Sequence, residues 1–439
     1  MSVDLFPADA SAHLAGPDWL RARRAAAVEA LGRSELPTAD LEEWRYSRIR
    51  DLRPERFSLV GTGGSPEPAG SADTSVPVPS ASVIAELGDL AGVAVVHNGR
   101  LVAVDVRPDL VERGVRFGGA TEEGDGVLGA AIEHAPDAFA VLNDAFCADP
   151  VLLSVPRGVT VEQPFAVLHH VDLEGSATFP RLAVQAGDDS EVSIIEVSTS
   201  SDVEAMVAPV TELAVGSAAR VRHSALQDLG PRVWQLGSLV GTVGQDATLR
   251  SAVAALGGDY ARLRLDCRLV GRGAHGDLAS VYFGDGDQML DLRTFQEHRA
   301  PDTTSHLLFK GAVADHSHSV YTGLIRIKPE ARGTNAFQTN RNLKLSEHAW
   351  AESVPNLEIE NNDVHCSHAS TVGPVDEDQR FYLESRGVPT AVAERLIVGG
   401  FFDEVIDDLP VPAVAEVVRA RVDALLDGQL GDVHAGHAA

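Results

Sequence analysis

The sequence predicts a mainly β protein: a stack of repeated strand units with helices at both ends. The first observation is that, from about Ala138 to Ser346, short runs of alternating apolar and polar residues are broken by Gly or Asp. Helical periodicity is nearly absent there. The second is a weak repeat of a turn glycine, a polar turn and a strand, at spacings of 29, 28 and 27 residues, beginning at Gly187, Gly216, Gly244 and Gly271.

The length of this repeat selects the architecture. Each unit is too short for a propeller blade and lacks the helix of a leucine-rich repeat. Self-similarity at a nearly fixed period is typical of stacked units, so a β-helix-like solenoid fits best. A β-sandwich is the alternative.

Residues 1–137 are expected to form an N-terminal helical region. Asp18 can cap a helix from Trp19 to Leu31, and the glycine that follows is a suitable helix end. Asp40 and Glu43 have the spacing of a capping box, which predicts a second helix or turn there.

The same region also contains a low-complexity segment and a hairpin signal. Residues 61–82 are rich in Gly, Pro and Ser and cannot bury enough apolar surface to offset their ordering entropy, so we expect a flexible insertion. The apolar runs 93–96 and 101–104 flank an Asn-Gly pair at 98–99. This pair prefers the type I′ turn and therefore predicts a β-hairpin.

Residues 138–372 are expected to form the β core. The segment from Tyr260 to Val270 alternates most clearly between charged and apolar residues, which predicts one wet and one dry face. Cys267 would then face the core as a small apolar side chain. The residues predicted to face water are Arg262, Arg264, Asp266 and Arg268.

The pattern changes again in residues 373–430, which are expected to form a C-terminal helical region. Three segments are typical of helices, 376–386, 390–408 and 413–426, with Gly and Pro residues between them. The last residues, 431–439, are expected to be a disordered tail.

Charge and hydropathy exclude several classes of partner. A formal net charge of −28 and a pI of about 4.8 would repel nucleic acid and anionic lipid. No run approaches the ~18 apolar residues of a membrane span, and the first residues resemble no signal peptide. We therefore expect a cytoplasmic protein without nucleic acid or membrane partners.

Seven of the sixteen histidines lie between His298 and His368, which concentrates metal-ligand candidates near the end of the β region. Residues two apart on a strand share a face, so the members of such a pair can point at one ion. The candidate groups are His298 with His306, His316 with His318, and His365 with Cys366 and His368.

Cys366 and His368 are the better pair, because a thiolate and a neutral imidazole suit iron or zinc. Two ligands are too few for a stable site, so distant residues or a second protein must supply the rest. An incidental buried thiol remains the alternative. The pair His316 and His318 invites a cupin-like interpretation, but no carboxylate follows in residues 319–325.

Common catalytic motifs are absent from the sequence. It contains no GxxxxGK[ST] phosphate loop, no GxSxG elbow and no HExxH helix. The chain therefore offers no motif for NTP hydrolysis, acyl transfer or zinc protease chemistry of its own.

Several segments resemble the SufB/SufD family of iron–sulfur cluster assembly proteins. The run from Asn342 to Val405 is similar to the C-terminal signature of that family, and the segments 298–306 and 309–311 are similar to further family motifs. LPTADLEEWRY at 36–46 resembles the N-terminal helical region of the SufD branch. DVHCSHASTVG at 363–373 also resembles the SufD form rather than the SufB form.

This resemblance implies a right-handed parallel β-helix core flanked by N-terminal and C-terminal helical regions. It implies a non-catalytic subunit that pairs with a SufB-like scaffold and docks a SufC-like ATPase through its C-terminal helices. It implies no tightly bound cofactor in the isolated chain. A transient iron–sulfur cluster, or iron, would sit at the SufB interface, with His368 and Cys366 as ligands. Homodimerisation without SufB is left open.

The sequence differs from the family pattern at two places, and two alternative functions stay open. His365 stands where SufD often has Lys, and the insertion at 61–82 lengthens the N-terminal region. One alternative function is a structural adaptor without ligands. The other is a stand-alone metal-dependent β enzyme that uses His316 and His318.

Overall fold

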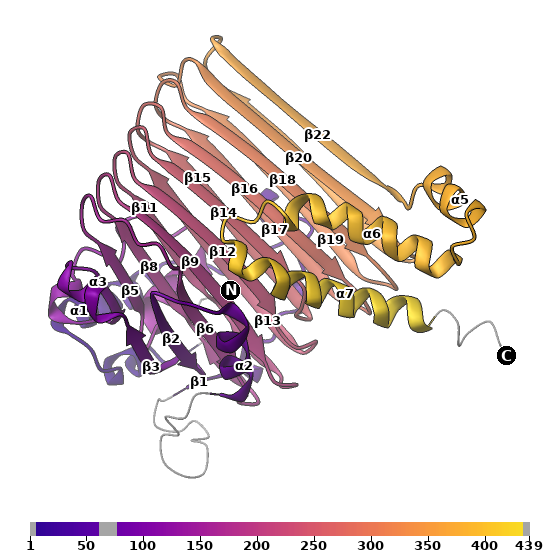
Figure 1. Cartoon of the computed structure of the whole chain (residues 1–439). Coiled ribbons are helices and arrows are strands. Elements are labelled where there is room, and N and C mark those ends of the chain that lie inside the picture. The colour runs from indigo at the N-terminus through magenta and orange to yellow at the C-terminus, as the bar shows by residue number, and fades with distance from the viewer. Residues whose placement is uncertain (1–5, 61–76, 433–439) are drawn as a thin grey trace.

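Two long parallel sheets face each other in a β-solenoid of about 8 turns, which is flanked by the N-terminal and C-terminal helices of the chain (Figure 1). The computed structural model describes residues 6–60 and 77–432. Strands account for 42% and helices for 24% of the chain. These observations confirm the predicted parallel β-helix flanked by helical regions.

Successive strands of the solenoid alternate between the two sheets, so that each coil adds one strand to each sheet. Only the pairs β2–β3 and β4–β5 are antiparallel among the pairs of the described residues. The main path of the 12-stranded sheet is β21 (Trp350–Ile359), β19 (His318–Ile327), β17 (Met289–His298), β15 (Tyr260–Leu269), β13 (Val233–Val243), β11 (Val210–Val215), β8 (Arg181–Ala186), β5 (Val151–Val155) and β4 (Arg116–Gly119).

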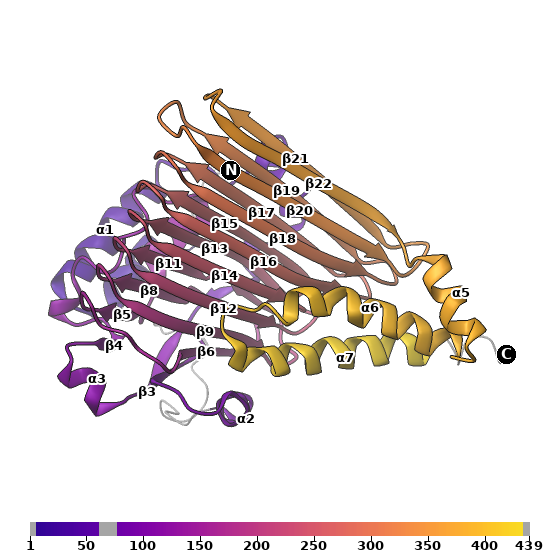
Figure 2. The same ribbon diagram turned by 45° about the horizontal axis from the view of Figure 1, so that its top comes forward.

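The same sheet carries three short strands off this path, β1 (Ser58–Leu59), β7 (Ser176–Thr178) and β10 (Ala205–Val207). The order of the 10-stranded sheet is β22 (Val364–Pro374), β20 (Thr334–Lys344), β18 (Thr304–Val313), β16 (His275–Gly284), β14 (Thr248–Ala255), β12 (Arg220–Asp228), β9 (Glu191–Ser200), β6 (Phe165–Val171), β2 (Gly92–His97) and β3 (Arg100–Val106). The strands β21 and β22 are therefore the outermost strands at the same end of the solenoid (Figure 2).

The repeated glycines lie where one coil passes closely over the next. A Cβ atom at Gly271 would lie 2.0 Å from the backbone nitrogen of Gln245 in the preceding coil. A Cβ atom at Gly244 would lie 3.0 Å from the carbonyl oxygen of Val215. The glycine of the sequence repeat is thus required by the close approach of stacked turns.

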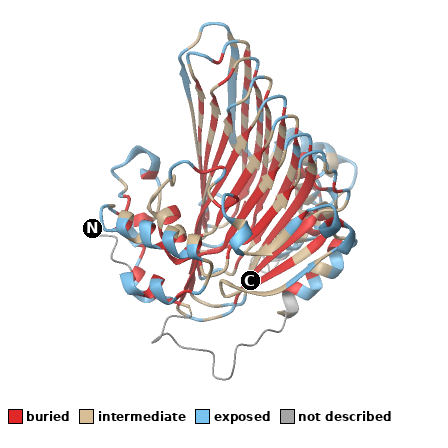
Figure 3. Ribbon diagram, turned by 90° about the vertical axis from the view of Figure 1, so that its left-hand side faces the viewer, coloured by how far each residue is buried: buried red, intermediate tan, exposed pale blue. Residues whose placement is uncertain are grey.

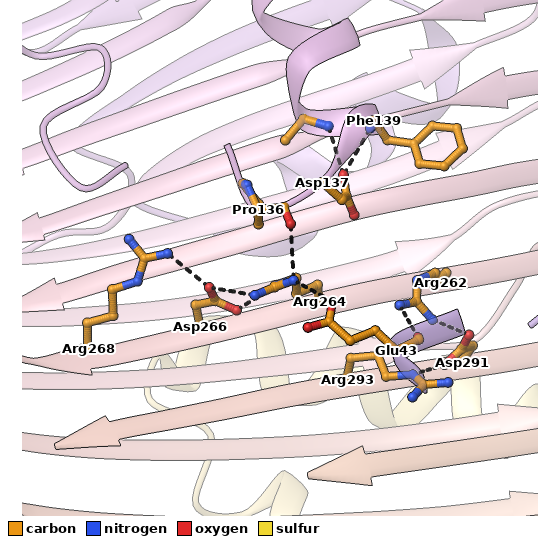
Figure 4. A network of polar contacts seen from close by, with 11 residues as sticks. Glu43, Pro136, Asp137, Phe139, Arg262, Arg264, Asp266, Arg268, Asp291 and Arg293 are labelled. Atoms are coloured by element: carbon orange, nitrogen blue, oxygen red, sulfur yellow. Dashed lines mark hydrogen bonds and ion pairs between the residues drawn. The ribbon is translucent and has the colours of Figure 1, made fainter. Parts of the chain in front are cut away.

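Apolar side chains fill the space between the two sheets, as the red inner strands of Figure 3 show. Leu265 and Cys267 of β15 are both 1% exposed and belong to this core, which confirms the predicted dry face. The prediction that the alternating polar residues face water is wrong for Arg262 and Asp266, which are each 3% exposed. N-terminal segments cover this face of β15, as Figure 4 shows for Glu43 and Pro136.

Residues 6–59 pack on the outer face of the 12-stranded sheet, through an apolar cluster that includes Trp234 of β13 and Tyr260 of β15. Helix α1 (Asp18–Leu31) has the predicted bounds within one residue, although Asp18 is its first residue and Pro17 its cap. The prediction of a capping box at Asp40 and Glu43 is wrong, because the 3-10 helix η2 (Glu42–Trp44) follows Leu41 and has no side-chain cap. Trp44 is buried, with the Arg262 guanidinium 3.8 Å above its ring. The remaining short helices are η1 (Ala8–His13), η3 (Ile49–Asp51), η4 (Pro54–Arg56), α3 (Pro108–Glu112), η5 (Glu122–Gly124) and α4 (Ala138–Phe146).

The predicted hairpin is confirmed by the antiparallel pair β2 and β3. Its turn residues Asn98 and Gly99 have φ angles of 48° and 77°, as a type I′ turn requires. Of the predicted flexible insertion 61–82, residues 61–76 lie outside the described residues. Its last residues belong to helix α2 (Val78–Leu87) instead.

The predicted C-terminal helices are present as α5 (Glu377–Ser385), α6 (Thr390–Ile406) and α7 (Ala415–Asp432), with a short 3-10 helix η6 (Pro412–Val414) before α7. Helices α6 and α7 pack on the outer face of the 10-stranded sheet through a second apolar cluster. Residues 433–439 of the predicted tail lie outside the described residues. No helix in the described part of the chain is long and apolar enough to cross a membrane.

Candidate functional site

The inner face of the solenoid is exposed at its C-terminal end, because no further coil follows β21 and β22 in the described chain. Leu357 and Ile359 of β21 are in register with Ile325 and Ile327 of β19, which are fully buried. Leu357 and Ile359 nevertheless have 38% and 45% of their surface exposed. On β22, Val372 is 42% exposed beside buried Asn342. We call this surface, formed by the inward-facing residues of β21 and β22, the open end.

Both predicted ligands lie at the open end. Cys366 is in register with buried Ala336 of β20 and packs against the small apolar cluster around that residue. His368, two residues along β22, is in register with Gln338 and is exposed. The pleat of a strand places Cys366 and His368 on the same face, with Cα atoms roughly 6–7 Å apart. His365 is on the opposite face of β22.

Gln338 is a site residue that the sequence-based prediction missed. It is 1% exposed, and neither polar atom of its side chain has a hydrogen-bond partner within the described residues. A Cβ atom at Gly323 would lie only 2.4 Å from the Gln338 Nε2 atom, so glycine makes room for the amide. The sequence contains a signal for Gln338, because it is two residues from Ala336 and therefore shares the core-facing side of the strand. A buried amide on that side needs a hydrogen-bond partner.

Thiol chemistry at the open end depends on one cysteine. All three cysteines are free. Burial raises the pKa values of Cys147 and Cys267 to about 12, so these thiols stay protonated and enclosed. Burial also raises the pKa of half-buried Cys366, so metal binding there would have to displace a proton.

Thiol labelling of the native chain is expected to occur first at Cys366. An aromatic disulfide reagent should give one fast phase, whose rate increases as the pH rises towards the elevated pKa of Cys366, because the thiolate is the reacting species. Cys366→Ser should remove that phase, whereas Cys267→Ser should leave it in place. An unchanged fast phase in Cys366→Ser would contradict this assignment.

The pair His298 and His306 is not a metal site. His298 is fully buried, and its ring nitrogens lie 2.8 Å from Thr303 Oγ1 and 2.9 Å from Ser305 Oγ. Burial lowers its pKa to about 4, so the ring is neutral. His306 instead stacks on Phe337, with ring centroids 5.5 Å apart.

His316 and His318 each contact a different aromatic ring. The ring of His316 stacks on His348, with centroids 5.1 Å apart, and His318 packs edge-on against Trp350. Among the described residues, no group of three or more His, Cys, Asp or Glu residues could hold a metal ion. The cupin-like arrangement therefore has no third ligand in this part of the chain, and neither has the pair Cys366 and His368.

A second exposed apolar surface lies on the C-terminal helices. Phe381 and Tyr382 of α5 are 70% and 57% exposed, and Val392 and Leu396 of α6 are 47% and 55% exposed. A groove of about 810 Å³ lies between these helices and strands β18 and β20. Large exposed apolar side chains of this kind are typical of protein interaction surfaces.

Comparison with known proteins agrees with the sequence motifs. The model of the SUF system FeS cluster assembly, SufBD core domain, matches residues 169–401. An iron–sulfur cluster assembly SufBD family protein of Mycobacterium tuberculosis is 34% identical over 334 residues, covering 74% of this chain and 82% of the relative. The iron–sulfur cluster assembly protein SufD of Bacillus subtilis is 30% identical over 285 residues, covering 64% and 65%. A SufBD family protein of Staphylococcus haemolyticus is 24% identical over 94% of this chain and 91% of its own.

Proposed function

Because the chain belongs to the SufB/SufD family of SUF iron–sulfur cluster assembly proteins, we propose that it is the SufD-type subunit of a complex with a SufB-like scaffold and a SufC-like ATPase. In this role it is non-catalytic, works in the cytoplasm and contributes to cluster formation and iron entry. The observation that carries the proposal is that Cys366 and His368 lie on the exposed inner face of the last coil.

The open end is suited to pairing with a SufB-like subunit. The strands β21 and β22 each have a paired neighbour on one side, β19 and β20, and are the last strands of their sheets. Unpaired strand edges with exposed apolar residues are templates for strand addition from another chain. A partner that docks here would cover Leu357, Ile359 and Val372 and bring its own ligands to Cys366 and His368.

Such an interface explains why the ligand set is incomplete in one chain. A nascent cluster or an iron ion needs about four ligands, and the described chain supplies two in this place. Cys366 would lose its proton and bind iron as a thiolate. His368 would bind it through a neutral ring nitrogen of its imidazole. The amide of Gln338 could then donate a hydrogen bond to a cluster sulfide or to a ligand.

The C-terminal helices are suited to carry the ATPase. Their exposed apolar residues form the docking surface that we propose for a SufC-like subunit. Lys310 of β18 links this surface to the solenoid, because its ammonium donates a 2.7 Å hydrogen bond to the carbonyl of Phe401 and pairs with Glu404, both on α6. β20 lies between β18 and β22, so a shift of α6 driven by ATP can reach the open end.

The test is anaerobic iron and sulfide analysis of the complex purified through a tag on this chain. His368→Ala should assemble normally with the SufB-like and SufC-like subunits but lose most of the cluster, and Cys366→Ser should lower the cluster content. His365→Ala is the matched control, because it removes an imidazole from the opposite face of the same strand.

Unchanged cluster content in both His368→Ala and Cys366→Ser would refute the ligand role and leave the structural adaptor. Failure of the chain to purify with either subunit would refute the proposed complex. Tight metal binding by the isolated chain that depends on His316 and His318 would favour the metal-enzyme alternative.

A further inference from the structure

A groove of about 540 Å³ lies on the outer face of the 12-stranded sheet, on the opposite side of those strands from the solenoid core. Strands β15, β17, β19 and β21 form its floor, and the segment around η2 forms a wall. Its lining combines both charges. The cationic residues are Arg264, Arg268, Arg293, Arg299 and Arg326, and the anionic residues are Glu42, Glu43, Asp266, Glu297 and Glu358.

Most of these arginines already have a carboxylate partner. Arg264 and Arg268 both pair with Asp266, as the dashed lines in Figure 4 show. Arg299 pairs with Glu297 at 2.8 Å, and Arg326 pairs with Glu358 at 2.5 Å. Arg264 also pairs with Glu43 at 3.1 Å, so these four arginines all have a carboxylate partner within the lining, whereas the partner of Arg293 is Asp291.

Arg293 shares its carboxylate with a second buried arginine. Asp291 is fully buried and accepts hydrogen bonds from Arg262 and from the Arg293 Nε atom at 2.9 Å (Figure 4). It also accepts one from the Tyr260 hydroxyl at 2.9 Å. The two guanidinium groups lower the pKa of Asp291, although burial alone would raise it. Asp291 is therefore the ion-pair partner of both buried arginines, and of the Arg293 guanidinium it holds the Nε atom.

A second carboxyl group, that of Asp137, interacts with Arg262 and Arg264. It accepts hydrogen bonds from the backbone N–H groups of Phe139 and Ala140 as the cap of α4. Burial raises the pKa of Asp137, and the backbone N–H groups and the charges of Arg262 and Arg264 oppose that rise.

Two donor groups that lack a hydrogen-bond partner among the described residues belong to the lining of the groove. Arg293 is 2% exposed, and its Nη2 atom has no hydrogen-bond partner within the described residues. Thr322 is the residue of β19 in register with Arg293, and its buried Oγ1 atom also has no partner in the described part of the chain. Both residues line the groove. A guanidinium N–H beside a hydroxyl group is an arrangement that binds an oxyanion.

We propose that this groove binds a small organic or inorganic oxyanion, a carboxylate or a phosphate, whose oxygens accept hydrogen bonds from Arg293 Nη2 and Thr322 Oγ1. The ligand adds a negative charge beside Arg293, which shares Asp291 with Arg262. The acidic residues at the edge of the groove disfavour large polyanions, so the site selects small ligands. This inference does not depend on the proposed role in cluster assembly.

Isothermal titration calorimetry of the full chain with inorganic phosphate and with citrate tests the proposal, with sodium chloride of equal ionic strength as the reference. We expect saturable binding of at least one of the two, and the stronger one identifies the source as phosphate or carboxylate. Thr322→Val keeps the shape and every charge of the groove, and should weaken binding about tenfold, the size expected for one hydrogen bond to a charged group.

Two further variants complete the test. Arg293→Met should abolish binding, and its circular dichroism should show that the solenoid still folds. Arg326→Met is the control, because that arginine lines the groove but is paired with Glu358. No saturable binding of either anion to the wild type, or equal affinity in Thr322→Val and wild type, would overturn the proposal.

Discussion

Arg181→Met is expected to destabilise the chain by about 3–5 kcal/mol, the usual cost of leaving one member of a buried ion pair without its partner. The side chains of Arg181 and Glu212 are each 1% exposed. The guanidinium also lies 3.1 Å from Asp144 and donates to Asn143, both on α4. These contacts attach α4 to β8 and β11.

In Arg181→Met, Glu212 would be a buried carboxylate without its ion-pair partner. In the wild type it accepts hydrogen bonds from Arg181 and from the backbone N–H groups of Gly129 and Ala131. Without the guanidinium, a buried carboxylate remains with backbone donors alone, and its desolvation is no longer offset. The double variant Arg181→Met/Glu212→Leu should recover most of the lost stability, because it removes both charges.

The measurement is urea unfolding followed by circular dichroism. The midpoint should fall clearly in Arg181→Met, whereas the control Arg326→Met, whose ion pair with Glu358 is exposed, should cost no more than about 1 kcal/mol. Equal midpoints for Arg181→Met and wild type would show that this pair does not hold the N-terminal region to the solenoid.

The repeat can be predicted from the sequence because it is local. A turn glycine and the alternation after it occur within each coil, so the residue pattern alone identifies Gly244 and Gly271 as turns of a stack. The Asn-Gly hairpin and the C-terminal helices are likewise set by residues close to one another in the chain. For this reason the strands of the core and the three C-terminal helices agree with the prediction.

The errors come from contacts between distant segments. Alternation on β15 correctly separated two faces, but it could not show that η2 and the residues before α4 cover the polar one. The buried state of Arg262 depends on Trp44 and on the carbonyl of Glu43, more than 200 residues away in sequence. Local spacing also gave a capping box at Asp40 that tertiary packing replaced with η2.

The candidate site was predicted only in part. Spacing of two on a strand placed Cys366 and His368 on one face, and the register of β20 and β22 bears out a shared strand. The sequence could not show that this strand is the last of its sheet, or that Gln338 lies beside His368 with no partner among the described residues. Both facts depend on how the coils stack.

The second large effect is expected at the open end. Leu357→Asp/Val372→Asp should prevent pairing with the SufB-like subunit, because each substitution places a charge on a surface that the partner must desolvate. Both residues are already exposed in the single chain, so its fold should be retained. The matched control is Val104→Asp on β3, which is equally exposed at 42% but lies at the other end of the same sheet as Val372.

Hydrogen exchange of the wild-type chain, alone and with the SufB-like subunit, tests the central claim most directly. We predict that edge amides of 350–359 and 364–374 exchange quickly in the isolated chain and become strongly protected in the complex. Val104→Asp should keep this protection and Leu357→Asp/Val372→Asp should lose it. A stable complex in which β21 and β22 exchange as fast as in the isolated chain would contradict the account, because the partner would then bind elsewhere and the ligands of the open end would remain incomplete.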